Sequence, residues 1–219
     1  MQIVPLQAEV LDDNATGYET NGHGLHLSTA RLTDEAKIKL ISNHFREIMK
    51  IIGLDVQDDS LNDTPNRVAK MYVKEIFSGL NAANHPKITL FENKYKYNKL
   101  VIEKNITLHS YCEHHFLPIV GKAHVAYISS GKIIGLSKLN RIVQFNAKKP
   151  QVQERLTEEI AASLKQILKS QDVAVMIDAT HYCVAMRGVN DTNSSTITSH
   201  FGGRFQNEDL KSEFLLSVK

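Results

Sequence analysis

Two short stretches of the sequence carry residue types that bind metal ions. Cys112, His114 and His115 fall within four positions, and Cys183 lies two residues after His181. A thiol and an imidazole three residues apart, such as Cys112 and His115, can reach one ion from a single tight turn. Two cysteines and one histidine match the ligand set of a catalytic zinc ion, whose fourth position stays open for water. Similar ligands also accommodate iron or manganese.

Two other interpretations of the cysteines stay open. Cys112 and Cys183 are 71 positions apart and could be two unrelated thiols. A disulfide is the weaker interpretation, because a chain with two cysteines and no apolar run of membrane-spanning length is typical of a reducing compartment. The first residues lack the basic and then apolar order of a signal peptide. We therefore expect a cytoplasmic protein with no membrane association.

The composition is that of an ordinary globular protein. The chain has 219 residues, of which 42% are hydrophobic and 23% charged, enough for one large domain or a domain with a smaller partner. The formal net charge of +2 is too small to predict binding to nucleic acid. Any anionic ligand must therefore be met by local clusters of cations.

The first part of the chain predicts helices after a polar, glycine-containing arm at residues 1–30. Apolar residues recur at spacings of three and four over 33–52 and 64–78, which indicates two amphipathic helices. Thr33 and Thr64 are the expected N-caps. The buried stripe expected on the second helix consists of Val68, Met71, Tyr72 and Ile76.

The second part of the chain alternates strands with helices. Residues 99–110 and 119–130 predict two antiparallel strands, and the turn between them carries the first metal-binding stretch. A turn on a sheet is a stiff place to hold ligands. With a final helix, the pattern indicates an α+β fold. The later elements are a helix capped by Ser137 over 138–145, a helix over 151–169, a strand over about 194–201 and a helix over 207–218 capped by Asn207.

Residues 173–187 predict a third strand that carries the second metal-binding stretch. Side chains alternate between the two faces of a strand. The pattern therefore places His181, Cys183, Ala185 and Arg187 on one face, so that an imidazole, a thiol and a guanidinium would lie in a row.

A series of ordered blocks resembles the GTP cyclohydrolase I family from about residue 30 to residue 217. The resemblance implies the tunnelling fold, in which ββααββ units join their antiparallel strands into an oligomeric barrel. It also implies a homodecamer of two pentameric rings with active sites at subunit junctions. We expect an arm at 1–30, a helical region at 31–95 and a catalytic domain at 96–219. The blocks are Asp63-Thr-Pro-Asn-Arg-Val68, Pro86-Lys-Ile-Thr-Leu90, Cys112-Glu-His-His115, Ile134-Gly-Leu-Ser-Lys138, Asn140-Arg-Ile-Val-Gln-Phe145, Pro150-Gln-Val-Gln-Glu-Arg-Leu156, His181-Tyr-Cys-Val184 and Arg187-Gly188.

The resemblance implies zinc-dependent conversion of GTP and water to 7,8-dihydroneopterin triphosphate and formate, the first step of tetrahydrofolate and tetrahydrobiopterin biosynthesis. Histidine titrates near working pH, so His114 and His181 are expected to act as general acid/base groups, with His181 protonating the purine. Ser137 matches the family serine near the ribose. The zinc ligands carried over by position are Cys112, His115 and Cys183.

The resemblance also implies a set of GTP-binding residues. Glu154 matches the carboxylate that accepts hydrogen bonds from N1 and N2 of guanine, and Gln153 lies beside it. Cations are expected to bind the triphosphate, since arginine's planar fork suits phosphate oxygens. These cations are Lys138, Arg141, Arg187 and Arg67.

Simpler interpretations accompany each of these assignments. Ser137 alone is usually only a helix cap, Glu154 alone on a helix usually faces solvent, and Lys138 with Arg141 could form an ordinary wet surface. The chain could also be a non-catalytic zinc- or purine-binding protein, or a related tunnelling-fold enzyme that acts on another pterin or deazapurine. A P-loop GTPase is excluded, because the sequence contains no Gly-x-x-x-x-Gly-Lys-[Ser/Thr] motif.

Overall fold

The computed structural model describes residues 32–129 and 131–219, which form two compact units divided between Ser78 and Gly79. The expected arm at residues 1–30 lies outside the described residues. The division of the chain into arm, helical region and catalytic domain therefore stays a prediction. Within the described ranges, no helix combines the length and the apolar character that a membrane crossing requires.

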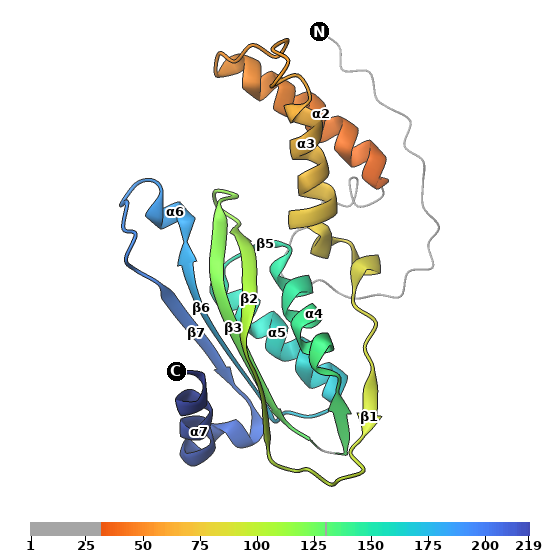
Figure 1. Cartoon of the computed structure of the whole chain (residues 1–219), viewed down its shortest axis with the longest axis vertical. Coiled ribbons are helices and arrows are strands. Elements are labelled where there is room, and N and C mark those ends of the chain that lie inside the picture. Colours follow the sequence, from red (N-terminus) through yellow and green to blue (C-terminus); the bar gives the residue numbers. More distant parts are fainter. Residues whose placement is uncertain (1–31, 130) are drawn as a thin grey trace. The chain divides into compact units, whose positions relative to one another are not determined.

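The N-terminal unit is built on a pair of helices (Figure 1). Helix α2 spans Asp34–Ile51, and its N-cap Thr33 accepts a hydrogen bond at Oγ1 from the backbone N of Ala36 at 3.2 Å. Gly53, at a φ of +89°, follows the helix. Helix α3 spans Thr64–Met71 and continues as a π-helical turn over Tyr72–Ile76. Both predicted helices are confirmed.

The predicted N-cap of α3 is wrong. The capping position belongs to Asp63, and Thr64 is the first helical residue. The chain enters α3 from a turn in which the Thr64 backbone N already donates to Leu61 O at 3.0 Å, so the threonine side chain is not needed as a cap. The Asp63 carboxylate instead accepts hydrogen bonds from Asn66 Nδ2 and Arg67 Nε, each at 3.1 Å.

The buried stripe of the second helix is only partly as predicted. Ile76 is buried, whereas Val68, Met71 and Tyr72 are half-buried. The buried residues of α3 are instead Pro65 and Ala69.

The C-terminal unit contains a five-stranded sheet in the order β5-β2-β3-β6-β7. The four long strands are antiparallel, and β5 pairs in parallel with the end of β2. A small second sheet pairs β1 with β4. The bounds are Leu90–Glu92 for β1, Leu100–Cys112 for β2, Pro118–Ile128 for β3, Lys132–Ile134 for β4, Pro150–Gln151 for β5, Val173–His181 for β6 and Thr196–Phe201 for β7.

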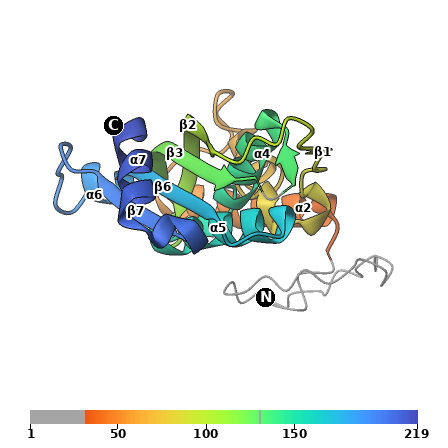
Figure 2. The same cartoon turned by 90° about the horizontal axis from the view of Figure 1, so that it is seen from below.

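Helices cover the sheet on both faces. Helices α4 (Leu136–Ala147) and α5 (Gln153–Leu168) pack on one face, where apolar side chains of β2, β3 and β6 form the main core with them. Helix α7 (Glu208–Val218) packs on the other face, at the end of the sheet away from α6 (Figures 1 and 2). Asn207 caps α7 as predicted, accepting at Oδ1 from Asp209 N at 3.0 Å. The expected α+β fold is confirmed.

The predicted cap of α4 is wrong. Strand β4 ends at Ile134, Gly135 takes the N-cap position, and Ser137 is an exposed residue inside the first turn. The turn closes without a side chain, because the backbone N of Lys138 donates to Gly135 O at 2.7 Å.

The predicted strand over residues 173–187 is too long. Strand β6 ends at His181, and the chain then forms the short helix α6 over Tyr182–Ala185. The neighbouring strands explain the end, since Ile119 of β3 is the partner of His181 and the pairing with β7 stops at Ala179. The row of four side chains on one strand face, from His181 to Arg187, is therefore wrong.

Strand β2 contains a bulge far from its end. Its register with β3 shifts between Glu103 and Ile106, so that Lys104 and Asn105 lie opposite the single residue His124. Asn105 adopts a left-handed φ of +61°, and its backbone N donates to Nδ1 of the buried His124 ring at 3.4 Å. An extra residue in one strand of an antiparallel pair leaves an unpaired amide, and His124 supplies its partner here.

Candidate metal centre

The central strand β3 brings the two metal-binding stretches together. On one side its first residue, Pro118, lies opposite Tyr111 of β2. On the other side Ile119 lies opposite His181 of β6. The end of β2 and the end of β6 therefore meet at the start of β3, which explains how cysteines 71 positions apart become neighbours.

A tight turn holds the first two predicted ligands. Cys112 is the last residue of β2 and is buried. The backbone N of Cys112 donates to Leu117 O and the backbone N of Phe116 donates to Cys112 O, both at 2.8 Å. Phe116 takes a positive φ of +54°, which lets the chain reverse within these residues. His115 is thereby placed on the same side of the turn as the Cys112 sulfur, whose distance to His115 Nδ1 is 4.0 Å.

The three predicted ligands converge with Cys183 of α6. One ligand atom each from Cys112, His115 and Cys183 lies within 4.8 Å of the others. Zinc bonds of about 2.0–2.3 Å in a tetrahedron put ligand atoms roughly 3–4 Å apart, so a small adjustment would close this group on an ion. Both cysteines are free thiols, which contradicts the disulfide interpretation. Two sulfurs and one imidazole nitrogen fit a zinc-type ion.

The surroundings of Cys183 disfavour its thiolate form. Burial raises the pKa of the Cys183 thiol, and the neighbouring Cys112 raises it further. Arg187 acts in the opposite direction. A metal ion requires the thiolate form and stabilises it, so the ion would compensate the energetic cost of placing the buried Cys112 sulfur beside the half-buried Cys183 sulfur.

His181 is held by a buried amide beside the metal centre. Its Nε2 lies 2.8 Å from Oε1 of Gln153, a residue that is only 1% exposed at the start of α5. The Gln153 Nε2 donates to three oxygens: Thr196 O at 2.8 Å, Thr198 Oγ1 at 3.1 Å and Ile177 O at 3.3 Å. Because two of these are backbone carbonyls, the amide has one orientation and its oxygen must accept from His181.

Burial of His181 favours the neutral form of its imidazole. Burial lowers the pKa of His181, and the exposed Glu154 carboxylate opposes this shift. The hydrogen bond to Gln153 puts the ring proton on Nε2, which leaves Nδ1 as the nitrogen with a free lone pair. The structure therefore brings Gln153, Glu154 and His181 together, but the Gln153 amide is engaged with His181 and the sheet, so its predicted contact with GTP stays a prediction.

His114 and Arg187 also lie at the centre. His114 has Nδ1 at 3.7 Å from Cys112 Sγ and Nε2 at 3.8 Å from Glu113 Oε1. Arg187 Nη1 lies 2.8 Å from His115 Nε2, and arginine has no acceptor, so the guanidinium donates. Two further predicted site residues are thus placed beside the metal ligands.

Three further predicted residues belong to α4 and are not brought to the metal centre within the C-terminal unit. Helix α4 begins beside Tyr127, whose hydroxyl oxygen accepts from Ile134 N at 3.3 Å, and Tyr127 is nine residues along β3 from Pro118, or roughly 30 Å. The helix then runs back toward the end of β2, where Ser110 Oγ donates to Ala147 O at 2.8 Å (Figure 1). Along the helix axis, Ser137 and Lys138 therefore lie about 14–15 Å from Ala147, on the side away from Cys112, and Arg141 lies about 9 Å from it.

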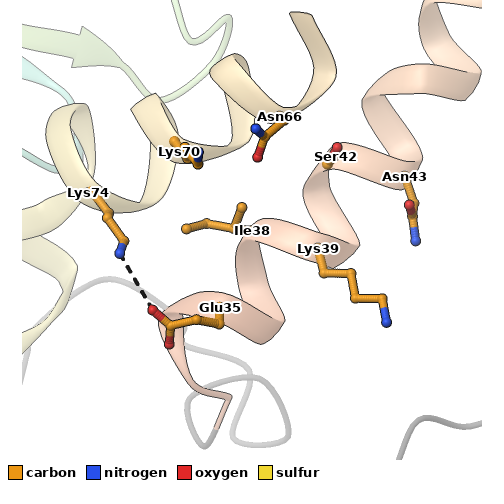
Figure 3. Close-up of a pocket in the computed structure, with 8 residues that line it drawn as sticks. All are labelled: Glu35, Ile38, Lys39, Ser42, Asn43, Asn66, Lys70 and Lys74. Atoms are coloured by element: carbon orange, nitrogen blue, oxygen red, sulfur yellow. Dashed lines mark hydrogen bonds and ion pairs between the residues drawn. The ribbon is translucent and has the colours of Figure 1, made fainter. Parts of the chain in front are cut away.

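Arg67 belongs to the N-terminal unit, where it pairs with Asp63. That unit also contains a cavity of about 430 Å³ between α2 and α3, bordered by Lys39, Lys70 and Lys74 (Figure 3). The residues around this cavity include no cysteine or histidine, so it does not offer a second soft metal site. The role expected for Arg67 stays a prediction.

Glu113 and Arg155 were not predicted as site residues, yet both lie beside the turn that carries the metal ligands. Arg155 Nη2 makes an ion pair with Glu113 Oε2. Both residues fall inside the sequence blocks shared with the family, but neither is a residue type that the expected chemistry needs.

The chain thus combines a curled α+β fold with a Cys/His/Cys group near the ends of its central strands. These features place it in the class of proteins with a metal-binding centre. The GTP cyclohydrolase I family model matches residues 41–219. A Flavobacterium johnsoniae protein named GTP cyclohydrolase 1 is 57% identical over 188 residues, covering 86% of this chain and 84% of the relative. One of the same name from Erwinia tasmaniensis is 52% identical over 206 residues, covering 94% and 92%. The chain belongs to the GTP cyclohydrolase I family.

Proposed function

We propose that this chain converts GTP and water to 7,8-dihydroneopterin triphosphate and formate, using a zinc ion held by Cys112, His115 and Cys183. The observation that carries the proposal is the convergence of these three residues beside His181, in a chain of the GTP cyclohydrolase I family. The product would serve folate and pterin biosynthesis. When bound, zinc supplies a water nucleophile at neutral pH, because it lowers the pKa of its water to about 7.

His181 has the proton-transfer role at the purine. Attack on carbon 8 of guanine requires a proton on the imidazole nitrogen of the base. His181 lies at the end of β6 next to Cys183, and its Nε2 is committed to Gln153. Nδ1 carries a lone pair in the neutral ring, so it first accepts the proton that the attacking water releases and then delivers that proton to the imidazole nitrogen of the base. Gln153 acts as a positioning residue, since its own amide hydrogens are all directed into the sheet.

His114 is the second acid/base group. Its side chain is 65% exposed and contacts the metal turn through Cys112. An exposed imidazole can exchange protons with water while it faces the substrate, which the ring-opening transfers need. Ser137 then acts at the ribose during rearrangement.

Different side chains meet the guanine and the triphosphate of GTP. Glu154, at the start of α5 and exposed, presents two acceptors to N1 and the exocyclic N2 of guanine. Arg187 beside His115 is the first cation for the triphosphate. The other phosphate cations are Lys138, Arg141 and Arg67.

A second copy of the chain completes the site. Ser137 and Lys138 lie in the first turn of α4, at its end away from Cys112, and Arg141 lies about one turn further along. We therefore expect them to meet a nucleotide at the metal centre of another copy. Joining sheets of neighbouring subunits into a barrel would let α4 of one copy reach the metal centre of the next. This requirement supports the tunnelling-fold oligomer, a decamer of two pentameric rings, as the active form.

The test is formate release from GTP by the purified chain, with zinc measured on the same sample and a chelator-treated control. Formate and a fluorescent pterin, both lost on metal removal and restored by zinc, are the expected result. About one zinc ion per chain without formate would overturn the catalytic proposal and leave a metal-binding protein of the same fold.

A further inference from the structure

A chain of alternating charges runs from the buried start of α5 to the metal turn. Lys149 Nζ lies 3.0 Å from Glu159 Oε2, and the same oxygen accepts from Gln151 Nε2 at 3.0 Å. Gln151 Oε1 accepts from Arg155 Nε at 3.0 Å. Arg155 Nη2 then pairs with Glu113, the residue after Cys112. Two cations and two carboxylates thus alternate along one connected path.

The path has only one possible direction of hydrogen bonding. Gln151 Nε2 also donates to the backbone oxygen of Asn146 at 3.1 Å, so the amide nitrogen faces two acceptors and the amide oxygen must face Arg155. Arg155 Nη2 donates to Pro150 O at 3.1 Å as well as to Glu113. Three acceptors therefore fix the plane of the guanidinium, and that plane fixes the Glu113 carboxylate.

The burial of these groups argues against a role in stability alone. Gln151 is fully buried and the Lys149 side chain is 9% exposed, while Glu113 reaches 30% at the surface end. Taking ions out of water is costly, and a buried ion pair is weak evidence for stabilisation. What the path does provide is a rigid connection between α5 and the metal turn.

The path ends on the groups that the proposed reaction uses. Glu113 N donates to Gln151 O at 3.0 Å, so the residue is held by its backbone as well as by its side chain. Its second carboxylate oxygen, Oε1, lies 3.8 Å from His114 Nε2, and Cys112 Sγ lies 3.7 Å from His114 Nδ1. The His114 ring is thus placed between an anchored carboxylate and a metal-ligand sulfur.

We propose that Glu113 and Arg155 are positioning residues that hold the Cys112–His115 turn for metal binding and orient His114 for proton transfer. The inference about His114 rests on the proposed function, whereas the inference about metal binding does not. Residues that hold metal ligands in place typically contribute about 10–100-fold in metal affinity or activity. Without the pair, the turn keeps its backbone hydrogen bonds but loses its side-chain anchor on α5.

The test compares Glu113→Gln and Arg155→Gln with Glu158→Gln in the full chain. Glu158 is also on α5 and pairs with His200 at 2.9 Å, so its variant makes the same charge change as Glu113→Gln without touching the path. Zinc affinity is measured by competition with a chromophoric chelator, without GTP. We expect affinity to fall about tenfold in the first two variants and not in the third. The double variant Glu113→Gln/Arg155→Gln should lose no more zinc affinity than the single variant with the larger loss, because the two side chains act as a unit.

Turnover at saturating zinc provides the second readout. We expect a lower kcat with an unchanged KM for GTP, and partial recovery in Arg155→Lys, which retains one donor for Glu113. Wild-type zinc affinity in both variants would overturn the proposal. So would a loss fully explained by a lower melting temperature of the zinc-free chain, which would indicate a purely structural brace. Failure of the proposed function would appear separately, as absent formate release in the unsubstituted protein.

Discussion

The two strand ends that form the metal centre hold their histidines in different ways. At the end of β6, His181 is fixed by the neutral, buried amide of Gln153. At the end of β2, His114 lies on a partly exposed turn anchored by the charged pair Glu113–Arg155. A buried neutral partner fixes which nitrogen carries the proton, whereas a charged partner at the surface fixes orientation and leaves the ring open to water. The comparison suggests one histidine specialised for a fixed proton position and one for exchange.

Replacing Cys183 should have the largest effect, because the metal depends on both strand ends. In Cys183→Ser a weaker oxygen donor replaces a thiolate, and we expect loss of bound zinc and at least about a 1000-fold fall in formate release. Metal content of the purified variant, measured by mass spectrometry, checks the prediction. Full zinc occupancy would remove Cys183 from the ligand set. Met186→Ser, an exposed residue directly after α6, is the control.

His114→Ala tests the acid/base role of the histidine at the end of β2 without removing a predicted metal ligand. The variant keeps all three predicted ligands, so we expect wild-type zinc content and assembly, with turnover reduced about 10²–10⁴-fold. Formate release together with size-exclusion chromatography measures both properties. Normal turnover would show that His114 has no part in the mechanism.

Gln153→Leu tests the β6 end. The substitution leaves His181 without its partner, so we expect kcat to fall about 10–100-fold while KM for GTP changes little. A direct contact between Gln153 and the substrate predicts the opposite, a raised KM. Glu154→Gln is the matched comparison, since it alters the adjacent exposed carboxylate and should raise KM. Both rates are normalised to the folded fraction, because a lost buried amide also destabilises the chain.

The smallest effect concerns acid stability away from the centre. Burial lowers the pKa of His124, Lys122 and Lys104 lower it further, and Asp178 opposes them. The unfolded chain therefore takes up a proton first as pH falls below about 6.5, and stability is lost from there down to the folded pKa. In His124→Asn, which keeps an acceptor for the Asn105 amide, we expect a smaller loss of unfolding free energy between about pH 7.5 and 5.5. Urea unfolding at both pH values checks this, and an unchanged loss contradicts it.

Local patterns predicted most elements but not where each begins or ends. Helix α2, the strands β2 and β3 and the Asn207 cap follow from spacing and residue type. The caps at Thr64 and Ser137 failed because the preceding turn or strand, not the hydroxyl, decides where the helix starts. Strand β6 stops where its neighbours stop, which no local pattern contains.

The same distinction applies to the site. Cys112, His115 and Cys183 could be predicted as ligands because their residue types are ones that bind metal ions. They converge in the structure because β3 brings the two stretches together. The anchoring roles of Gln153 and Arg155 could not be predicted, since amide and guanidinium groups acquire a direction only from partners distant in sequence.

The bulge in β2 sets the phase of the strand that carries the first metal ligand. Before it, the odd-numbered Val101 packs on the main core, and after it the even-numbered Ile106, Leu108 and Cys112 do so. Because side chains alternate strictly, one extra residue exchanges odd for even. In a chain lacking Asn105, either the residues before the bulge, such as Val101, or those after it, including Cys112, would move to the opposite face of the sheet. Asn105, seven positions before Cys112, therefore determines which face of the sheet this metal ligand occupies, although Asn105 is not itself a predicted ligand.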